Sequence, residues 1–376
     1  MAVLALIFAV LTLVGVVQLV YGARLVQVFC AKAHHQRPAT KPGVSILKPL
    51  CGVEPLSELA LESFFVLDYP HYQLVLGVQN PQDPVLDIIA RLRARYPQRD
   101  VALMVNDTAH GRNYKVANLI NMRPLAKYEI LVVADADIHA PVYYLDDVVA
   151  SLEQPQVGLV TSLYTGLPSA LTLAAKLGAM QINHLFLPSA LLGRRLGRQD
   201  CMGATMALTK TMLAQIGGFE ALVNHLADDQ VLGRLVVKAG YKVGLAHMVP
   251  STTVPEAEFA SLYQHELRWA RTIRALVPLA YTGSVLQNPL LWALLAVLAS
   301  GFGWWSLVLF LGVWAARCLT AWQIEAALRL PRTRAVWLFL LRDVFSAIIY
   351  GVSFMGSRVA WRGQSLMADS GRPIPG

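Results

Sequence analysis

Long apolar segments at both ends of the chain constrain its fold more than any other feature. The first covers residues 2–30 and is long enough to cross about 30 Å of hydrocarbon. No basic stretch precedes it and no small-residue cleavage pattern ends it, so we interpret it as a retained anchor and not as a signal peptide. The apolar stretch near the C-terminus is too long for one crossing. There we expect helices at about 285–300 and 304–325, with a further candidate at about 336–355.

Charged residues are concentrated between these apolar segments. The chain has 32 Lys and Arg residues against 24 Asp and Glu residues, a formal net charge of +8. This split predicts a polar domain held between membrane segments: a transmembrane anchor over 1–30, a central domain over 40–278, and transmembrane helices over 285–356. No nucleic-acid-binding motif accompanies the basic excess, and attraction to anionic lipid headgroups explains it more simply.

Basic residues beside the apolar segments give an orientation. Lys32 follows the first segment, Arg268 and Arg271 precede the second, and Arg332 and Arg334 lie between the last two. Cytoplasmic loops of membrane proteins are enriched in Lys and Arg. We therefore expect the central domain to be cytoplasmic.

Ionisable residues also occur within the C-terminal apolar segments. Arg342 and Asp343 leave open whether the segment at 336–355 spans the membrane, re-enters it or lies at its surface. Charged groups at such positions usually face a protein partner, because contact with lipid is costly. We predict that Arg317 and Asp343 lie near each other as a structural pair.

The central region alternates between strand-like and helix-like patterns. Helical spacing over 57–67 and 84–96 separates short apolar runs, which we expect to be strands at 44–47, 73–78, 101–105 and 130–134. Strands separated by helices of this length form βαβ units. The sequence predicts an α/β domain with a mixed, mostly parallel sheet.

Two acids follow the last of these strands. Asp135 and Asp137 come directly after the apolar run Ile130–Ala134. Ligands of open α/β sheets bind beyond the carboxyl ends of the strands, and two carboxylates there can hold a divalent cation through oxygen. The alternative is that both acids only form a turn before Pro141.

Asp228 and Asp229 stand at the start of a second pattern, helical to about Ala239 with Gly240 as its stop. They can cap the helix and favour its positive end. An acid at this position can equally project into a cleft and accept the proton of an attacking hydroxyl. The spacing does not choose between these two roles.

A third motif, His265-Glu266-Leu267-Arg268-Trp269, lies in an expected helix just before the C-terminal membrane segments. Arg268 beside Trp269 can bind a diphosphate and stack on a sugar or lipid group. An amphipathic helix at the headgroup level is the alternative for the same residues. The apolar stretch 163–200 leaves a similar choice between an interfacial helix that admits a lipid and an ordinary core helix.

In this order, these motifs resemble the ceramide glucosyltransferases and their bacterial relatives, membrane members of the GT-A glycosyltransferases. The resemblance extends from about Gly43 to Pro278. It is carried also by Gly43-Val44-Ser45-Ile46-Leu47-Lys48-Pro49-Leu50, Leu67-Asp68-Tyr69-Pro70, Gly77-Val78-Gln79 with Asp83-Pro84, and Val157-Gly158-Leu159-Val160.

The resemblance implies a GT-A fold and a metal-dependent inverting transfer from a UDP-sugar to a membrane lipid. Asp135 would bind the donor and, with Asp137, Mg²⁺ or Mn²⁺. Asp229 would be the catalytic base. Acceptor contacts fall on Asp228 and on His184, which matches a family histidine near the acceptor opening.

The remaining donor contacts implied by the resemblance include two departures from the family pattern. Asn80 replaces the acid that follows Gly-Val-Gln and supplies no charge. His265 replaces the first Arg or Gln of the Arg/Gln-x-x-Arg-Trp signature and is cationic only when protonated. Gln264 can take its place if the register shifts. Arg268 and Trp269 match the signature.

Within the family, residues 110–122 are similar to the bacterial hopanoid-biosynthesis branch, which favours N-acetylglucosamine as the sugar, a hopanoid polyol as the acceptor, and the bacterial inner membrane as the location. Lys115 in this segment is suited to a diphosphate, although a solvated loop lysine is the alternative. Ceramide with UDP-glucose is the other substrate pair. Rivals are a processive polysaccharide synthase, a catalytically degenerate membrane scaffold and a transporter.

Overall fold

The structure is a computed structural model that describes residues 1–32, 37–361 and 364–368. The chain forms two compact units. We call the unit made of Ala33–Ser169 and Leu196–Pro255 the α/β unit, and the unit made of Met1–Lys32, Ala170–Arg195 and Glu256–Gly376 the helical unit. Two parts of the expected central domain, 170–195 and 256–278, therefore cluster with the terminal helices.

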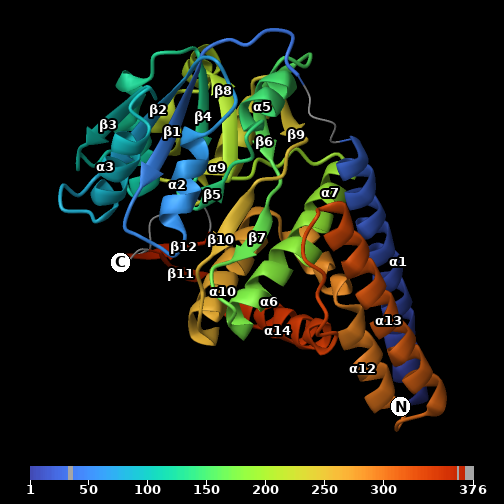
Figure 1. Cartoon of the computed structure of the whole chain (residues 1–376). Helices are drawn as coiled ribbons and strands as arrows, with labels where there is room; N and C mark the ends of the chain where they lie inside the picture. The colour runs from blue at the N-terminus through green and yellow to red at the C-terminus, as the bar shows by residue number, and fades with distance from the viewer. Residues whose placement is uncertain (33–36, 362–363, 369–376) are drawn as a thin grey trace. The chain divides into compact units, whose positions relative to one another are not determined.

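A seven-stranded sheet forms the centre of the α/β unit, with the strand order β3-β2-β1-β4-β8-β6-β9 (Figure 1). The pairs β1–β2, β1–β4, β2–β3 and β6–β9 are parallel, whereas β8 is antiparallel to β4 and to β6. The predicted fold class, a mixed and mostly parallel sheet, is confirmed. The strands are β1 (Val44–Leu50), β2 (Tyr72–Val78), β3 (Val101–Val105), β4 (Ile130–Ala134), β6 (Val157–Ser162), β8 (Thr205–Thr209) and β9 (Lys242–Ala246).

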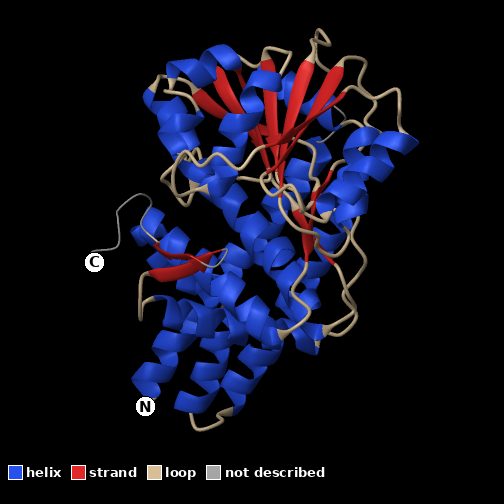
Figure 2. Cartoon of the chain, turned by 90° about the vertical axis from the view of Figure 1, so that its left-hand side faces the viewer, coloured by secondary structure: helices blue, strands red, loops and turns tan. Residues whose placement is uncertain are grey.

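The central strands are apolar on both faces because helices cover both sides of the sheet (Figure 2). On β4, Val132 belongs to one core and its neighbours Leu131 and Val133 to the other, as the alternation of side chains along a strand requires. The first core contains side chains of α2 (Ser57–Phe65), α3 (Val85–Arg95) and α5 (Tyr144–Leu152), and the second contains side chains of α4 (Tyr114–Met122), α8 (Lys210–Gln215) and α9 (Asp228–Lys238).

A small sheet with the order β5-β10-β7 lies in the same unit. Its strands are β5 (Ile138–His139), β7 (Thr165–Pro168) and β10 (Ser251–Val254). Since β5 begins one residue after Asp137, its pairing with β10 fixes the turn that follows β4. The apolar stretch 163–200 therefore starts as strand and not as helix, because β7 pairs with β10 along four residues.

The helical unit combines helices from both ends of the chain with helices from its middle, Ala170–Arg195. Its core contains side chains of α6, α10, α12, α13 and α14. The helices are α1 (Ala2–Lys32), α6 (Leu173–Gln181), a π-helical turn (Ile182–Phe186), α7 (Leu187–Arg195), α10 (Phe259–Leu276), α11 (Pro278–Gly283), α12 (Pro289–Ala299), α13 (Trp304–Ala327) and α14 (Trp337–Ser353), and the hairpin β11 (Arg358–Trp361) and β12 (Gln364–Met367) follows them.

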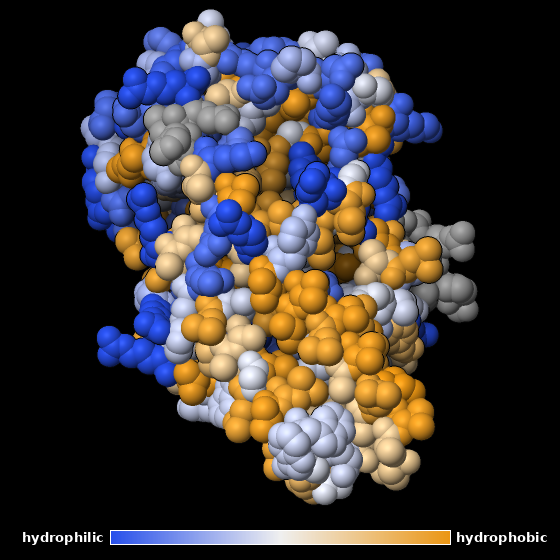
Figure 3. All heavy atoms as spheres, turned by 90° about the vertical axis from the view of Figure 1, so that its right-hand side faces the viewer, coloured by the Kyte–Doolittle hydropathy of each residue, from blue (hydrophilic) through white to orange (hydrophobic). Residues whose placement is uncertain are grey.

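Two described helices, α1 and α13, are long and apolar enough to cross a membrane. The pair Pro278–Gln287 and Pro289–Ala299, bent by 62°, would add a third span if it crosses as one. Along α1, small residues such as Ala5 and Ala9 are buried whereas Leu6 and Val17 are exposed. Hydrophobic residues also gather over the lower part of the face shown in Figure 3, whereas its upper part is mostly hydrophilic. Small residues toward other helices and large ones outward are typical of membrane helices, so the protein is a membrane protein.

The expected span at 336–355 is the seventeen-residue helix α14, which is not among these candidates. Its ionisable residues are fully buried inside the helical unit. The prediction that Arg317 and Asp343 form a pair is confirmed, since Arg317 Nε lies 3.3 Å from Asp343 Oδ1. Arg342 instead makes two hydrogen bonds of 2.7 Å to the carboxylate of Glu266 on α10.

Candidate active site

Asp135 and Asp137 lie at the edge of the sheet where the sequence predicts them. Asp135 directly follows β4, and its side chain is about one-third exposed. Asp137 accepts a hydrogen bond from the hydroxyl of Thr252 on β10. The turn expected from the same residues is therefore present, and it presents one carboxylate toward solvent while the small sheet holds the other.

Lys48, near the end of β1, holds this turn in place. Its side chain is fully buried, and Nζ donates a 2.7 Å hydrogen bond to the main-chain oxygen of Asp135. Nζ also lies 3.8 Å from the centroid of the Phe64 ring. A charged group in an otherwise apolar strand is costly unless it is compensated, and here the compensation comes from the acidic turn. No sequence pattern gives Lys48 a role of its own.

The second acidic pair stands at the start of α9. The helix begins with Ala227 as N-cap, and no side chain caps it, so Asp228 does not take the capping role. Asp229 accepts a 2.7 Å hydrogen bond from the main-chain N–H of Gln230. Asp228 is buried and receives a 3.4 Å hydrogen bond from Asn113 Nδ2.

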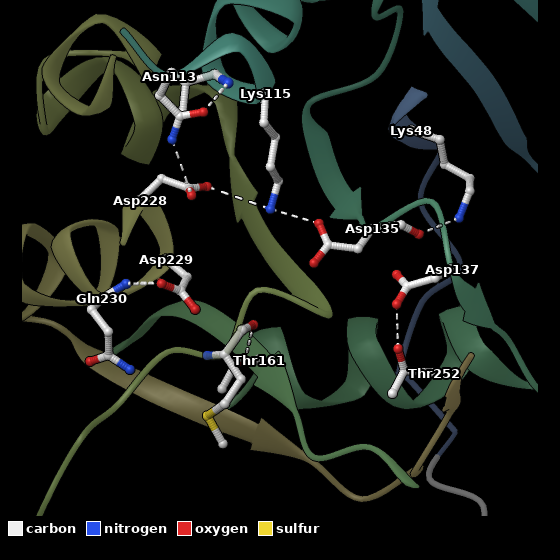
Figure 4. Close-up of polar contacts among 12 residues, drawn as sticks. Lys48, Asn113, Lys115, Asp135, Asp137, Thr161, Asp228, Asp229, Gln230 and Thr252 are labelled. Atoms are coloured by element: carbon white, nitrogen blue, oxygen red, sulfur yellow. Dashed lines mark hydrogen bonds and ion pairs between the residues drawn. The ribbon is translucent and has the colours of Figure 1, made fainter. Parts of the chain in front are cut away.

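Lys115 joins the two acidic pairs (Figure 4). It lies in the first turn of α4, whose N-cap Asn113 accepts a hydrogen bond from Val116 N–H. Lys115 Nζ lies 2.6 Å from Asp135 Oδ1 and 3.6 Å from Asp228 Oδ2. Lys115 is thus not a solvated loop lysine: its side chain is mostly buried and faces the acids.

Gly203 marks the point where these groups converge. A Cβ atom at this position would lie 3.4 Å from Asp135 Oδ2, 3.4 Å from Asp229 Oδ2 and 3.7 Å from Lys115 Nζ. The loop is held in place by Thr161, whose hydroxyl exchanges hydrogen bonds of 2.9 Å with the main chain of Met202. A glycine leaves this space open between the carboxylates. Sequence reasoning missed Gly203 because one loop glycine carries no pattern.

Burial and like charges shift the titration of these groups. Desolvation, reinforced by Asp228, raises the pKa of Asp229 to about 7. Desolvation and Asp135 raise the pKa of Asp137 to about 6. Burial lowers the pKa of Lys48 to about 7 although both acids of the turn oppose it. For Lys115 burial acts downward, but Asp135 and Asp228 outweigh it and the pKa is raised. Perturbed groups that cluster in this way mark a functional site.

The model of the family described as glycosyl transferase family 21 matches residues 7–374. The chain belongs to this family. The match includes both units, so the acidic site and the apolar helices are parts of one family architecture.

Curated proteins that are similar to this chain include ceramide glucosyltransferases. Ceramide glucosyltransferase 1 of Caenorhabditis elegans is 23% identical over 279 residues, which are 72% of this chain and 59% of the relative. A ceramide glucosyltransferase of Candida albicans is 35% identical over 122 residues, 29% of this chain and 22% of the relative. The chain thus spans little more than half the length of the first of these relatives.

A solved structure supports the fold. A mannosyltransferase from Pyrobaculum calidifontis, described in complex with GDP-Man and Mn²⁺, superimposes with a TM-score of 0.54 at 17% identity. The match covers 94% of this chain and 99% of that one. This likeness supports the fold of this chain as a GT-A-like α/β domain.

The family resemblance implies a divalent cation at Asp135 and Asp137, and the residues present fit one in part. Among the described residues no group of three or more His, Cys, Asp or Glu side chains could hold a metal ion alone. Mg²⁺, however, is usually bound by one or two carboxylates together with substrate phosphates. Asp135 is partly exposed, and the like charge of Asp137 beside it is incompletely compensated. This donor set suits a cation that arrives with a diphosphate.

Asn80, the expected donor contact, lies in the exposed turn after β2. Its side-chain oxygen accepts a 2.9 Å hydrogen bond from Gln82 N–H. Asn80 thus lies beyond the carboxyl end of β2, and its donor role remains a prediction. Asp83 beside it is buried and binds the main-chain N–H of Gly52, which ties the β1 and β2 loops together.

The other expected site residues belong to the helical unit. His265, Arg268 and Trp269 are partly buried on α10. His265 is hydrogen-bonded to Glu256 and makes an edge-on contact with Trp269 at 4.6 Å between ring centroids. His184 is almost fully buried in the π-helical turn, with Nε2 3.1 Å from Glu325 Oε1. Their donor and acceptor roles remain predictions.

Proposed function

We propose that this protein is an inverting glycosyltransferase that moves a sugar from a UDP-sugar to a hydroxyl group of a membrane lipid. The observation that carries the proposal is the convergence at Gly203 of Asp229, a carboxylate whose pKa is about 7, with Asp135 and Lys115. A general base is most effective when its pKa lies near the working pH. Asp229 meets this condition beside groups suited to a diphosphate.

In this mechanism Asp229 accepts the proton of the acceptor hydroxyl, whose oxygen attacks the anomeric carbon in line. Lys115 stabilises the negative charge that develops on the departing diphosphate. Lys48 keeps Asp135 in position through its main-chain oxygen. Mg²⁺ or Mn²⁺, held by Asp135 and Asp137, would supply further neutralisation of the diphosphate. Arg268, His265 and Trp269 are proposed as additional donor contacts.

For the substrates, the relatives favour ceramide and UDP-glucose, because those that match are named ceramide glucosyltransferases. The likeness of residues 110–122 to the hopanoid branch is the basis for the other pair, a hopanoid polyol and UDP-N-acetylglucosamine. Both acceptors are amphiphiles, and the candidate membrane helices α1 and α13 suit either. We place the α/β unit on the cytoplasmic side because basic residues flank these helices.

The decisive experiment offers purified full-length protein three donors, UDP-glucose, UDP-galactose and UDP-N-acetylglucosamine. Each is combined with ceramide, diacylglycerol and a hopanoid polyol, and the products are weighed by mass spectrometry. We expect glucosylceramide as the main product. Transfer to the hopanoid polyol alone would reverse the substrate choice and leave the mechanism standing.

The controls test the mechanism itself. Excess chelator should abolish turnover, and added Mg²⁺ or Mn²⁺ should restore it. Undiminished turnover in chelator would contradict the metal role. Absence of nucleotide release with every donor would indicate a membrane scaffold, and a soluble sugar accepted better than every lipid would refute the proposal.

A further inference from the structure

A pocket of about 700 Å³ opens in the helical unit near the C-terminal ends of α1 and α13. Gln27 and Cys30 of α1 line one side of it. Leu319 and Trp322 of α13 line the other, and Arg332, from the segment after α13, completes the wall. None of these residues takes part in the proposed sugar transfer.

The position of the pocket along the helices corresponds to the headgroup level of a membrane. Both α1 and α13 are candidate spans. Lys32 ends α1, and Arg332 and Arg334 follow α13, so the apolar helices give way to basic residues here. The transition from apolar to basic residues marks the border between hydrocarbon and headgroups. An occupant would therefore have an apolar part beside Leu319 and a polar part beside Arg332.

The guanidinium of Arg332 is positioned by Trp322. Its guanidinium carbon lies 3.8 Å from the centroid of the Trp322 ring. Trp322 is itself fixed by a 2.8 Å hydrogen bond from Nε1 to the main-chain oxygen of Thr333. Stacking on a ring leaves the N–H edges of a guanidinium available. Within the described chain, no oxygen accepts a hydrogen bond from Arg332.

The one acid of the pocket wall does not neutralise Arg332. Glu325 is almost fully buried, and its carboxylate accepts hydrogen bonds from the main-chain N–H and the hydroxyl of Thr333. Its oxygen Oε1 also lies 3.1 Å from His184 Nε2. The pocket therefore offers an uncompensated, oriented guanidinium next to an apolar wall. Arg forms paired hydrogen bonds with phosphate in this geometry.

We propose that this pocket binds an anionic phospholipid, with its phosphate on Arg332 and the start of an acyl chain along Leu319. Ceramide and hopanoid polyols are uncharged and do not match the guanidinium. The site is thus separate from that of the acceptor, and occupancy would anchor the end of α1 to α13.

Cys30 allows a direct test, because it lines the pocket and is partly exposed. Cys201 and Cys318 are buried, and Cys51 is exposed and is removed with Cys51→Ser. Maleimide labelling of Cys30 in this variant is measured in neutral detergent with added phosphatidylglycerol, phosphatidylcholine, ceramide or glycerol 3-phosphate. We expect phosphatidylglycerol to slow the labelling about tenfold and the others to have little effect. Equal protection by phosphatidylcholine or ceramide would overturn the charge argument. Equal protection by glycerol 3-phosphate would indicate a site for a soluble phosphate.

Four variants show whether the effect arises in this pocket. Arg332→Gln should raise the phosphatidylglycerol concentration needed for protection about tenfold, equivalent to about 1.4 kcal/mol. Arg334→Gln is the matched control, since Arg334 is exposed two residues away and does not line the pocket. Ala326→Trp, which fills the pocket, should abolish protection. Equal losses in Arg332→Gln and Arg334→Gln, or no loss in either, would contradict the proposal. Asp229→Asn should retain protection, so that failure of the transferase proposal is distinguished from failure of this one.

Discussion

Both units bury ionisable side chains, but they balance the charges differently. In the helical unit two buried arginines each have one acidic partner: Arg342 binds Glu266 through two hydrogen bonds, and Arg317 pairs with Asp343. In the α/β unit two acidic pairs share two lysines, and burial, reinforced by the like charges, raises the pKa of Asp137 and of Asp229. Matched pairs hold helices together, whereas clustered like charges are typical of sites that bind cations or move protons.

The difference also follows from position. The carboxylates of the α/β unit lie at the carboxyl edge of the sheet, where Asp135 is about one-third exposed. Arg317, Arg342 and Asp343 have no exposed surface at all. A group that cannot meet a ligand can contribute only to stability and specificity of the fold. The comparison therefore predicts that substitutions in one unit change rate and those in the other change stability.

The largest effect is expected from Asp229→Asn. The substitution keeps the shape of the side chain at the start of α9 but removes the proposed base. Loss of a general base typically lowers the rate by about 10²–10⁴-fold, while the thermal unfolding temperature should remain within a few degrees. The rate is measured as UDP release in single-turnover experiments. Asp228→Asn is the matched control, and a greater loss there would show that the base is the other acid.

Arg342→Met should have the converse effect. It leaves the carboxylate of Glu266 buried without its two hydrogen bonds, and removing one partner of a buried pair costs about 3–5 kcal/mol. Denaturant titration in detergent micelles measures this change in the free energy of unfolding. Arg95→Met is the control, because the Arg95–Glu62 pair lies at the surface, where solvent screens the charges, and its loss should change stability little. Similar losses in both variants would contradict the distinction between buried and exposed pairs.

The pH dependence of the transfer rate tests the role of Asp229 in the active site. Because Asp229 must be ionised to accept a proton and its pKa is about 7, kcat/KM should fall about tenfold per pH unit below pH 7. Asp229→Asn should remove this limb from the residual rate. A flat profile between pH 5 and pH 7 in the unsubstituted protein would exclude Asp229 as the titrating base.

The raised pKa of Asp229 also implies that the stability of the fold depends on pH. The folded state binds the Asp229 proton more tightly than the unfolded state, whose aspartates have a pKa of about 3.9. The resulting stabilisation is complete below about pH 4 and is lost as the pH rises through 7. Asp229→Asn should therefore make the fall in stability between pH 4 and pH 7 less steep, and the smaller contribution of Asp137, whose pKa is about 6, should remain.

Sequence periodicity predicted the elements that place the acids. The apolar run before Asp135 and the helical pattern after Asp229 correspond to β4 and α9. The pairing of Arg317 with Asp343 was predictable because an apolar surrounding leaves a charge few alternatives. The roles of Lys48 and Gly203 were not predictable, since each depends on contacts with residues far along the chain.

The division into units was also outside the reach of sequence patterns. The segment 170–195 has helical spacing after Thr172, which caps α6, but spacing does not say which neighbours its apolar face meets. Leu177 packs in the core of the helical unit with residues of α13 and α14. Likewise, Arg342 was recognised as an unusual residue in an apolar segment, but its partner Glu266 lies 76 positions away.

The smallest effect is expected from the double substitution Arg317→Leu with Asp343→Leu. Either change alone leaves a fully buried charge, and we expect each to cost about 3–5 kcal/mol. Together they replace the ion pair by apolar side chains next to Phe339, whose ring lies 5.4 Å from the Arg317 guanidinium. Replacement of a whole buried pair is often neutral or stabilising, so the double variant should unfold near the denaturant concentration of the original protein and keep its transfer rate. A double variant as unstable as the two single changes combined would mean that the charges do not compensate each other. A double variant that folds but loses transfer would mean that the helical unit, like the α/β unit, uses a buried charge in the reaction.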